Sequence, residues 1–293
     1  MTKDELKQKI EEFCENEHLN EKVNKTVVDY RNCLNKFYSS ITTDSIIINK
    51  ELSLQYKQYL TNILESGQAK VTSLNKYIIV FNKFLKYLDS NNKDYVIKQF
   101  RSQQKSSLEN QMSKQEHKRM LRKAKELGYI EIYMIIKVFA QSAIRISELR
   151  YFTKENIDKG PYIDIYSKGK ERKIILIGDL HRALKKYCKE YGITEGYIFR
   201  SPDPKRRSDP TKMINASTVW RNLKKIGGIA RVNLEHIHPH GWRHLFAIAY
   251  LELPGSTMTE LMDILGHSKV ETTSIYTRTT LKEKRERMEM IKF

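Results

Sequence analysis

Apolar residues recur along the first ninety positions at the spacing of amphipathic helices. Two stripes repeat at steps of three and four residues, which brings their members to one face of a helix. The first consists of Val23, Val27, Tyr30, Leu34 and Phe37, and the second of Leu74, Ile78, Phe81, Leu85 and Leu88. We therefore expect residues 1–90 to form a bundle of four helices around these stripes.

The periodic pattern ends between residues 91 and 113. This stretch, NNKDYVIKQFRSQQKSSLENQMS, is polar, rich in Gln and Ser, and carries no sustained apolar stripe. Such a composition is typical of a linker. We expect a helical domain over residues 1–90, a linker over 91–113 and a second domain over 114–293.

The second domain is predicted to be mainly helical. Helical periodicity runs from residue 114 to about 140, with a break at 126–128, and a short helix follows from about Ile146. Further helices are expected over 179–190, 216–227, 240–253, 257–265 and 270–279, and a short strand over 197–199. The run SPDPKRRSDP at 201–210 predicts a loop, because it holds three of the six prolines of the chain.

A β-hairpin interrupts the helical pattern after Gly160. Residues 162–166 alternate apolar with polar, and residues 174–177 supply the return strand. The turn between them contains Lys168, Gly169 and Lys170. The fold class expected from the whole pattern is therefore mainly α, with a small β-hairpin in the second domain.

The charge of the chain points to a polyanionic partner. The 53 Lys and Arg residues against 35 Asp and Glu residues leave a formal net charge of +18. A compact state with this excess repels itself, and a bound polyanion relieves the repulsion. Nucleic acid is the first candidate partner, and an anionic membrane surface is the second.

The sequence predicts a soluble protein of the cytoplasm. No run of about 18 apolar residues occurs, and the N-terminal segment MTKDELKQKIEEF lacks the apolar core of a signal peptide. The three cysteines, Cys14, Cys33 and Cys188, form no C-x-x-C pair. They are expected to be reduced thiols that pack in an intracellular protein.

Arg145 lies between two apolar residues in the run AIRISEL. A buried arginine needs a paired charge or an anionic ligand, because isolated burial of its charge is costly. One interpretation is an ion pair with Glu148, one helical turn further on. The other is a phosphate site, and the two are compatible if Glu148 orients the guanidinium while its other donors face the phosphate.

Four histidines follow one another in HIHPHGWRHLFA, namely His236, His238, His240 and His244. A metal site is not expected, because no Asp, Glu or Cys stands nearby at a ligand spacing. His240 and Arg243 lie three residues apart at a predicted helix start after a proline, hence on one face. They form either a clamp for an oxyanion or an ordinary surface pair.

Three further side chains acquire meaning only together with these. Lys168 and Lys170 are either solvated turn residues or groups that bind a phosphate or protonate a leaving alkoxide. His267 follows a glycine, and Tyr276, one of 17 tyrosines, stands nine positions later on a predicted helix. A tyrosine accompanied by cationic side chains from several separate motifs is suited to nucleophilic attack on a phosphate.

Four motifs together resemble the signature of the tyrosine recombinases, the integrase and Xer-type resolvase family. They are AIRISEL at 143–149, SKGKERKIIL at 167–176, HGWRHLFA at 240–247 and LGHSKVETTSIYTR at 265–278. The resemblance covers about residues 114–293, and the residues before them resemble the family's core-binding domain in length, helicity and position. Ala143 and Ile144 depart from the family, which commonly has a glycine and a leucine there, so we expect a tighter turn without loss of activity.

The resemblance implies a role for each matching residue. Tyr276 resembles the nucleophile that attacks the scissile phosphodiester, forming a 3′-phosphotyrosyl link and freeing a 5′-hydroxyl. Arg145 and Arg243 resemble the pair that holds the non-bridging oxygens. The general acid for the leaving 5′-oxygen corresponds to Lys168, with Lys170 as the alternative. The two remaining members, His240 and His267, would hydrogen-bond the phosphate or handle the tyrosine proton.

The resemblance implies a site-specific DNA recombinase for integration, excision or dimer resolution. Positioned cations and in-line geometry suffice for this chemistry, and the phosphotyrosyl link conserves the bond energy. We therefore expect no metal, ATP or other cofactor. Two alternatives are a catalytically inactive DNA-binding regulator on the same fold and a relaxing enzyme of the type IB topoisomerase kind.

The partners implied are double-stranded DNA and further copies of the chain. The helical domain and the catalytic domain would close on the duplex as a C-shaped clamp. The tail at 280–293 ends in the apolar residues Met288, Met290, Ile291 and Phe293. We expect it to dock on a neighbouring subunit of a homo-tetramer on DNA. Accessory DNA-bending or directionality proteins and a place at the prokaryotic nucleoid also follow from the resemblance, and no membrane is expected.

Overall fold

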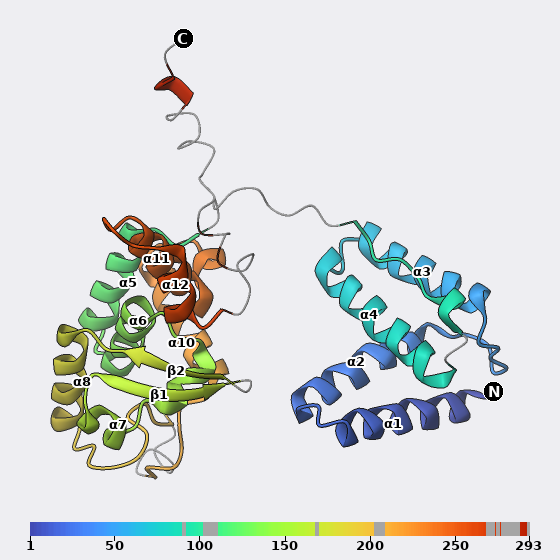
Figure 1. The fold of residues 1–293 in the computed structure, drawn as a ribbon, viewed down its shortest axis with the longest axis horizontal. Helices are drawn as coiled ribbons and strands as arrows, with labels where there is room; N and C mark the ends of the chain where they lie inside the picture. The colour runs from blue at the N-terminus through green and yellow to red at the C-terminus, as the bar shows by residue number, and fades with distance from the viewer. Residues whose placement is uncertain are drawn as a thin grey trace. The chain divides into compact units, whose positions relative to one another are not determined.

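A computed structural model of the chain divides into two compact units, Met1–Gln104 and Lys105–Phe293 (Figure 1). The structure describes residues 1–89, 92–101, 111–167, 170–201, 209–267, 273, 276 and 288–291, except for the side chains of residues 92, 93, 167 and 170. The expectation of a mainly helical chain with one small hairpin is confirmed.

Four helices build the first unit, as the apolar pattern predicts. They are α1 (Lys3–Leu19), α2 (Asn24–Ser40), α3 (Lys50–Glu65) and α4 (Val71–Leu88). Leu34 and Phe37 of one predicted stripe and Ile78 and Phe81 of the other are buried in the core of this unit. Val23 differs from its prediction, because α2 begins one residue later and leaves this side chain exposed at the N-cap.

The first part of the expected linker packs against the first unit. Its residues form a short 3-10 helix, η1 (Asn92–Tyr95), and an extended segment after it. The Asn82 side chain exchanges two hydrogen bonds with the backbone of Ile97, at 2.9 and 3.0 Å. Asn75 does the same with Phe100, at 3.0 and 2.7 Å. Residues 92–101 are therefore part of this unit, because two asparagines of α4 hydrogen-bond their backbone.

The second unit surrounds a helix that is apolar on nearly every side. In chain order its elements are α5 (Lys114–Glu126), α6 (Ile130–Ser142), η2 (Ile146–Tyr151), α7 (Lys154–Lys159), β1 (Tyr162–Ser167), β2 (Lys170–Ile175), α8 (Gly178–Glu190), α10 (Ala216–Ile229), η3 (Leu234–His236), α11 (Pro239–Leu251) and α12 (Met258–Leu265). The apolar helix is α6, and α5, α8, α10 and α11 all contact it. The core of the unit therefore lies around α6.

The hairpin forms where the alternation predicts it, with a longer return strand. Ile163 pairs with Ile174 in the antiparallel ladder, and both are buried. The return strand begins at Lys170 instead of residue 174, since charged residues can pair in a ladder whose other face is solvated. The hairpin contacts η2 through β1 and α12 through β2, which brings it beside two of the predicted motifs.

The strand expected over residues 197–199 is wrong. Tyr197 forms an isolated bridge with Thr153, and Arg200 forms another with Met213. Ile198 and Phe199 are buried in the core of the second unit, so their apolar character reflects burial and not membership of a sheet. The expected helix over 270–279 lies outside the described residues, apart from Thr273 and Tyr276.

Candidate active site

The turn after α6 sets the position of the first predicted site residue. Ala143 follows α6 in the left-handed conformation, with φ 49° and ψ 30°, and is fully buried. This conformation costs a residue with a Cβ roughly 1–2 kcal/mol relative to glycine. The chain therefore turns at Ala143, and this turn places Arg145 at the start of η2.

Arg145 pairs with Glu148, as one of the two interpretations predicts. Its Nη1 donates to Glu148 Oε1 at 3.0 Å, and its backbone N–H donates to Oε2 at 2.7 Å. The Arg145 side chain is 32% exposed, whereas that of Glu148 is 3% exposed. The carboxylate thus orients the guanidinium from the protein side, and the exposed part of the guanidinium remains open to an anion.

Glu148 stays ionised although it is buried. Burial alone would raise its pKa, but the hydrogen bond from the Arg145 backbone and the charges of Arg172 and Arg145 outweigh burial and lower the pKa below its usual value. Arg172 of β2 donates from Nη2 to Glu148 Oε2 at 2.7 Å. One carboxylate therefore holds two arginines from two elements.

Arg243 of α11 is almost completely buried, at 1% exposure. Its Nη1 donates to the carbonyl of Ala143 at 2.6 Å, and its Nη2 donates to the carbonyl of Leu265. Burial, followed by the charge of Arg145, lowers its pKa to about 10. The side chain therefore remains a cation at neutral pH.

His267 is placed by the end of α12. Gly266 ends that helix in the left-handed conformation, with φ 61°, and the His267 N–H then bonds to the carbonyl of Met262 at 3.0 Å. Its Nε2 lies 3.0 Å from Arg243 Nη2, and its Nδ1 lies 2.8 Å from Thr273 Oγ1. Since arginine can only donate, Nε2 accepts, and the ring proton is assigned to Nδ1.

Tyr276 lies in the same site, at 7% exposure. Its ring stacks on that of His267, with centroids 6.3 Å apart, and meets the edge of His244 at 4.9 Å. Burial raises the pKa of the hydroxyl, and the charges of Arg243 and Arg145 oppose that rise. The phenol is therefore mostly protonated at neutral pH and lies in the field of both arginines.

His240 is exposed at the first turn of α11, which begins with Pro239 as predicted. Partial desolvation lowers the pKa of its ring, and the charges of Arg243 and Arg145 add to this effect. The charges of Arg243 and Arg145 therefore act on His240 as well as on Tyr276.

The other histidines of this run have different surroundings. His236 pairs with Glu116 of α5 at 3.1 Å, a carboxylate 120 positions away in the sequence. His244 contacts Tyr276, and its Nδ1 is buried without a hydrogen-bond partner among the described residues. No three His, Cys, Asp or Glu side chains of the described ranges converge as metal ligands.

The predicted lysine lies at the edge of what the structure describes. Lys168 lies outside the described residues. The backbone of Lys170 is the first of β2 and pairs with Ser167 in the ladder. The assignment of the general acid to Lys168, with Lys170 as the alternative, therefore stays a prediction.

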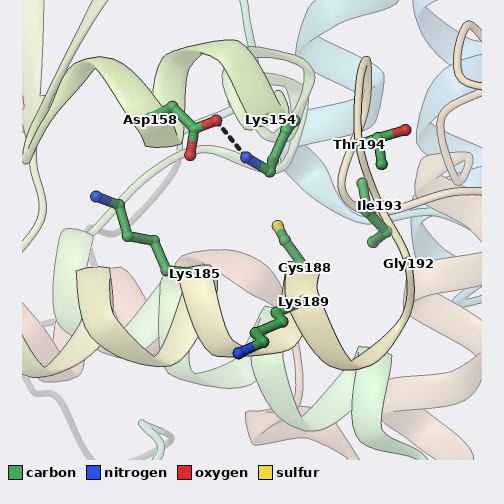
Figure 2. A pocket seen from close by; sticks show the side chains of 8 residues that line it. All are labelled: Lys154, Asp158, Lys185, Cys188, Lys189, Gly192, Ile193 and Thr194. Carbon is green, nitrogen blue, oxygen red and sulfur yellow. Dashed lines mark hydrogen bonds and ion pairs between the residues drawn. The ribbon is translucent and has the colours of Figure 1, made fainter.

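A separate pocket of about 530 Å³ lies between α7 and α8 and contains none of the predicted site residues (Figure 2). Lys154 and Asp158 form an ion pair at its rim, and Lys185 and Lys189 extend from α8. Burial raises the pKa of the Cys188 thiol there to about 11, so the thiol stays protonated and is a poor nucleophile. This agrees with the packing role expected for the cysteines. Among the helices of the described ranges, none has the length and apolar content that a membrane span requires.

Acidification is expected to destabilise the second unit between pH 6.5 and 5. Burial lowers the pKa of His117, His244 and His267 to about 4, from an ordinary value of 6.5. Below pH 6.5 the unfolded chain binds protons that the folded chain does not, so stability is lost as pH falls. Each histidine contributes at most about 1.4 kcal/mol per pH unit.

Urea denaturation at pH 7.0, 6.0 and 5.0 measures this effect, with Trp220 and Trp242, both in the second unit, as fluorescence reporters. Trp242 Nε1 donates to His117 Nδ1 at 3.0 Å. A His117→Gln variant keeps an acceptor for this bond and removes one titrating ring, so its stability should depend less on pH. Equal stability of the wild-type protein at all three pH values would contradict the expectation.

Recombinases and integrases are among the solved structures with the same fold. A lambda integrase dimer bound to a COC′ core site superposes with a TM-score of 0.73 at 15% identity, covering 94% of this chain and 95% of that one. The Tn1549 transposon integrase in complex with circular intermediate DNA gives a TM-score of 0.71 at 16% identity, covering 99% of both. At these identities the likeness establishes the fold.

The chain belongs to the phage integrase family, whose sequence pattern matches residues 110–283. It is 33% identical to the tyrosine recombinase XerC of Thermodesulfovibrio yellowstonii over 159 residues, which is 50% of each chain. It is 28% identical to the tyrosine recombinase XerA of Pyrococcus horikoshii over 290 residues, covering 97% of this chain and 93% of that one. The family resemblance inferred from the four motifs is thus confirmed.

Proposed function

We propose that this protein is a site-specific DNA recombinase that cleaves and rejoins strands through a covalent bond to Tyr276. The Tyr276 hydroxyl oxygen would attack the phosphorus of the scissile phosphodiester, while the bond from phosphorus to the 5′-oxygen breaks. The tyrosine loses its proton, and the 5′-oxygen gains one. Attack by a 5′-hydroxyl on the 3′-phosphotyrosyl ester then rejoins a strand and releases the tyrosine.

One observation carries this proposal: Tyr276 is buried against His267 and lies in the field of Arg145 and Arg243. The transition state of a phosphodiester spreads negative charge over its equatorial oxygens, which positioned cations stabilise. Arg145 is fixed by Glu148, and Arg243 by two backbone carbonyls. Both cations are therefore held before any DNA binds.

The two histidines have distinct roles in this proposal. His267 is neutral and accepts a hydrogen bond from Arg243, so it orients that guanidinium. His240 is exposed at the start of α11 and is assigned to a phosphate oxygen or to the tyrosine proton. Lys168, or Lys170 in its place, is assigned to protonation of the 5′-oxygen.

The partners proposed are duplex DNA and further copies of this chain. The net charge of +18 supports binding to phosphates, and affinity should fall steeply with salt. The solved lambda integrase tetramer bound to a Holliday junction has the same fold, with a TM-score of 0.73. The first unit as a core-binding domain, the clamp around DNA and the tetramer belong to this proposal.

A nicked duplex that traps the cleaved strand tests the proposal. Duplexes that the protein selects from a randomised pool would be nicked close to the cleavage point and incubated with it in the presence of a chelator. We expect a denaturation-resistant adduct whose DNA-linked peptide contains Tyr276. Binding without an adduct would favour the inactive regulator, and relaxation of plasmids that lack the selected site would favour the topoisomerase-like alternative.

Removal of residues 283–293 is expected to leave DNA binding intact and to abolish recombination. The described part of this tail exposes Met288, Met290 and Ile291, at 69%, 76% and 58%. Apolar side chains at a chain end gain stability when they are covered, and a neighbouring subunit would cover them. Gel-shift titration and a two-site plasmid recombination assay measure both properties. Unchanged recombination by the truncated chain would refute the exchange of tails.

A further inference from the structure

Arg172 lies within the candidate site, although the motifs assign it no role. It stands in β2, and its side chain is 12% exposed. Its Nη2 donates to Glu148 Oε2 at 2.7 Å, and its Nη1 donates to the carbonyl of Ile264 at 2.9 Å. One planar guanidinium therefore joins the hairpin to η2 and to the end of α12.

Both groups that Arg172 holds are themselves adjacent to predicted catalytic residues. Glu148 Oε2 also receives the backbone N–H of Arg145, and Oε1 receives the Arg145 side chain. Ile264 lies three residues before His267, and Arg145 Nη2 donates to the carbonyl of the intervening Gly266 at 3.3 Å. Arg172 and Arg145 therefore each hydrogen-bond both Glu148 and the end of α12.

The close fit at Gly266 shows how tightly this contact is built. A Cβ added to Gly266 would lie 2.5 Å from Cδ and 2.8 Å from Nε of Arg172. Since real side chains do not approach this closely, the Arg172 side chain occupies the space that any larger residue at 266 would need. The turn that presents His267 is therefore packed directly on the arginine.

Loss of Arg172 would leave Glu148 with one arginine instead of two. A buried carboxylate needs compensation of its charge, and the remaining guanidinium would have to supply it alone. Arg145 would then be drawn toward Glu148 and away from an incoming phosphate. The carbonyl of Ile264, at the end of α12, would lose its donor at the same time.

We propose that Arg172 is a positioning residue for strand cleavage: through Glu148 it keeps the Arg145 guanidinium directed at the scissile phosphate, and through Ile264 it fixes the turn that carries His267. This inference rests on the proposed strand cleavage. It concerns the orientation of the Arg145 guanidinium, and it requires no contact between Arg172 and DNA.

Two substrates separate this role from a general loss of folding. The first is the nicked duplex with an ordinary scissile phosphodiester, and the second carries a neutral methylphosphonate there. Since the neutral group develops less charge on its non-bridging oxygen, its cleavage depends less on Arg145 and Arg243. Arg172→Ala, Arg172→Lys and the control Lys173→Ala would be compared in single-turnover cleavage and thermal melting. Lys173 is the next residue of β2, is 63% exposed and pairs with Asp164.

Arg172→Ala should slow cleavage of the phosphodiester about 10²-fold, as expected when reacting groups are misplaced by about 1 Å. The reduction in the rate at which Arg172→Ala cleaves the methylphosphonate should be at least tenfold smaller, on the scale of one lost charge-assisted contact. Arg172→Lys should show the same difference between the two substrates in milder form. Lysine keeps the positive charge but lacks the planar guanidinium that binds Glu148 and Ile264 together. Lys173→Ala should cleave both substrates like the wild-type protein.

Equal losses on the two substrates would mean a merely structural role and would overturn the inference, as would wild-type cleavage by Arg172→Ala. In both cases an adduct formed by the wild-type protein would leave the proposed function standing. Absence of any adduct with the wild-type protein bound to DNA would overturn the proposed function and this inference together.

Discussion

A Tyr276→Phe variant is expected to bind duplex DNA like the wild-type protein and to form no covalent adduct with it. Phenylalanine keeps the ring that contacts His244 and His267 and removes only the hydroxyl. Cleavage should fall to background, on the order of 10⁶-fold, the scale seen when a covalent nucleophile is removed. Trapping on the nicked duplex and a gel-shift titration measure the two properties.

Tyr250→Phe is the matched control for this variant. Tyr250 of α11 packs against the same small apolar cluster as Tyr276, and its hydroxyl donates to Glu260 at 3.3 Å. This change removes a hydroxyl from the same region and should leave adduct formation unchanged. An adduct that persists in Tyr276→Phe, or one that disappears in Tyr250→Phe, would show that the nucleophile is misassigned.

Arg243→Ala is expected to impair both cleavage and stability. Removal of a cation that stabilises developing charge lowers the rate of such reactions about 10²–10³-fold. The variant also leaves the carbonyls of Ala143 and Leu265 without their donor, at a cost of about 1–3 kcal/mol for each buried group. Arg243→Lys should recover little, because one ammonium cannot reach both carbonyls and His267 together.

Single-turnover cleavage and thermal melting of the same preparations test this expectation. Arg182→Ala serves as the control, since Arg182 is an arginine of α8 with a 75% exposed side chain. It should match the wild-type protein in both measurements. An Arg243→Ala variant that melts earlier but cleaves at the wild-type rate would restrict Arg243 to a structural role.

Periodicity predicted most of the fold, and the motifs named four residues that the structure brings together, Arg145, Arg243, His267 and Tyr276. The apolar stripes predicted the helices of the first unit, and alternation predicted the hairpin. Arg145 and its partner Glu148 could be paired from sequence because one helical turn separates them. Local patterns of this kind are visible in a sequence because their partners lie within a few residues.

Contacts between distant residues could not be predicted in this way. Glu148 receives Arg172 from 24 positions away, and Arg243 donates to a carbonyl 100 positions away. Every residue has a backbone carbonyl, so the sequence could not indicate that Arg243 donates to the carbonyl of Ala143. Residues 92–101 differ from the linker expectation for the same reason, because their polar composition does not show that asparagines of α4 bind their backbone.

The carbonyls that hold Arg243 belong to the C-terminal ends of two helices, α6 and α12. Helix C-termini carry partial negative charge, so this cation is stabilised by oriented dipoles and not by a carboxylate at that contact. These dipoles offset less than a full charge, and they compete less with a bound anion for the guanidinium than a carboxylate would. Folding orients these dipoles once. Each catalytic cycle would then begin with little reorganisation around the phosphate.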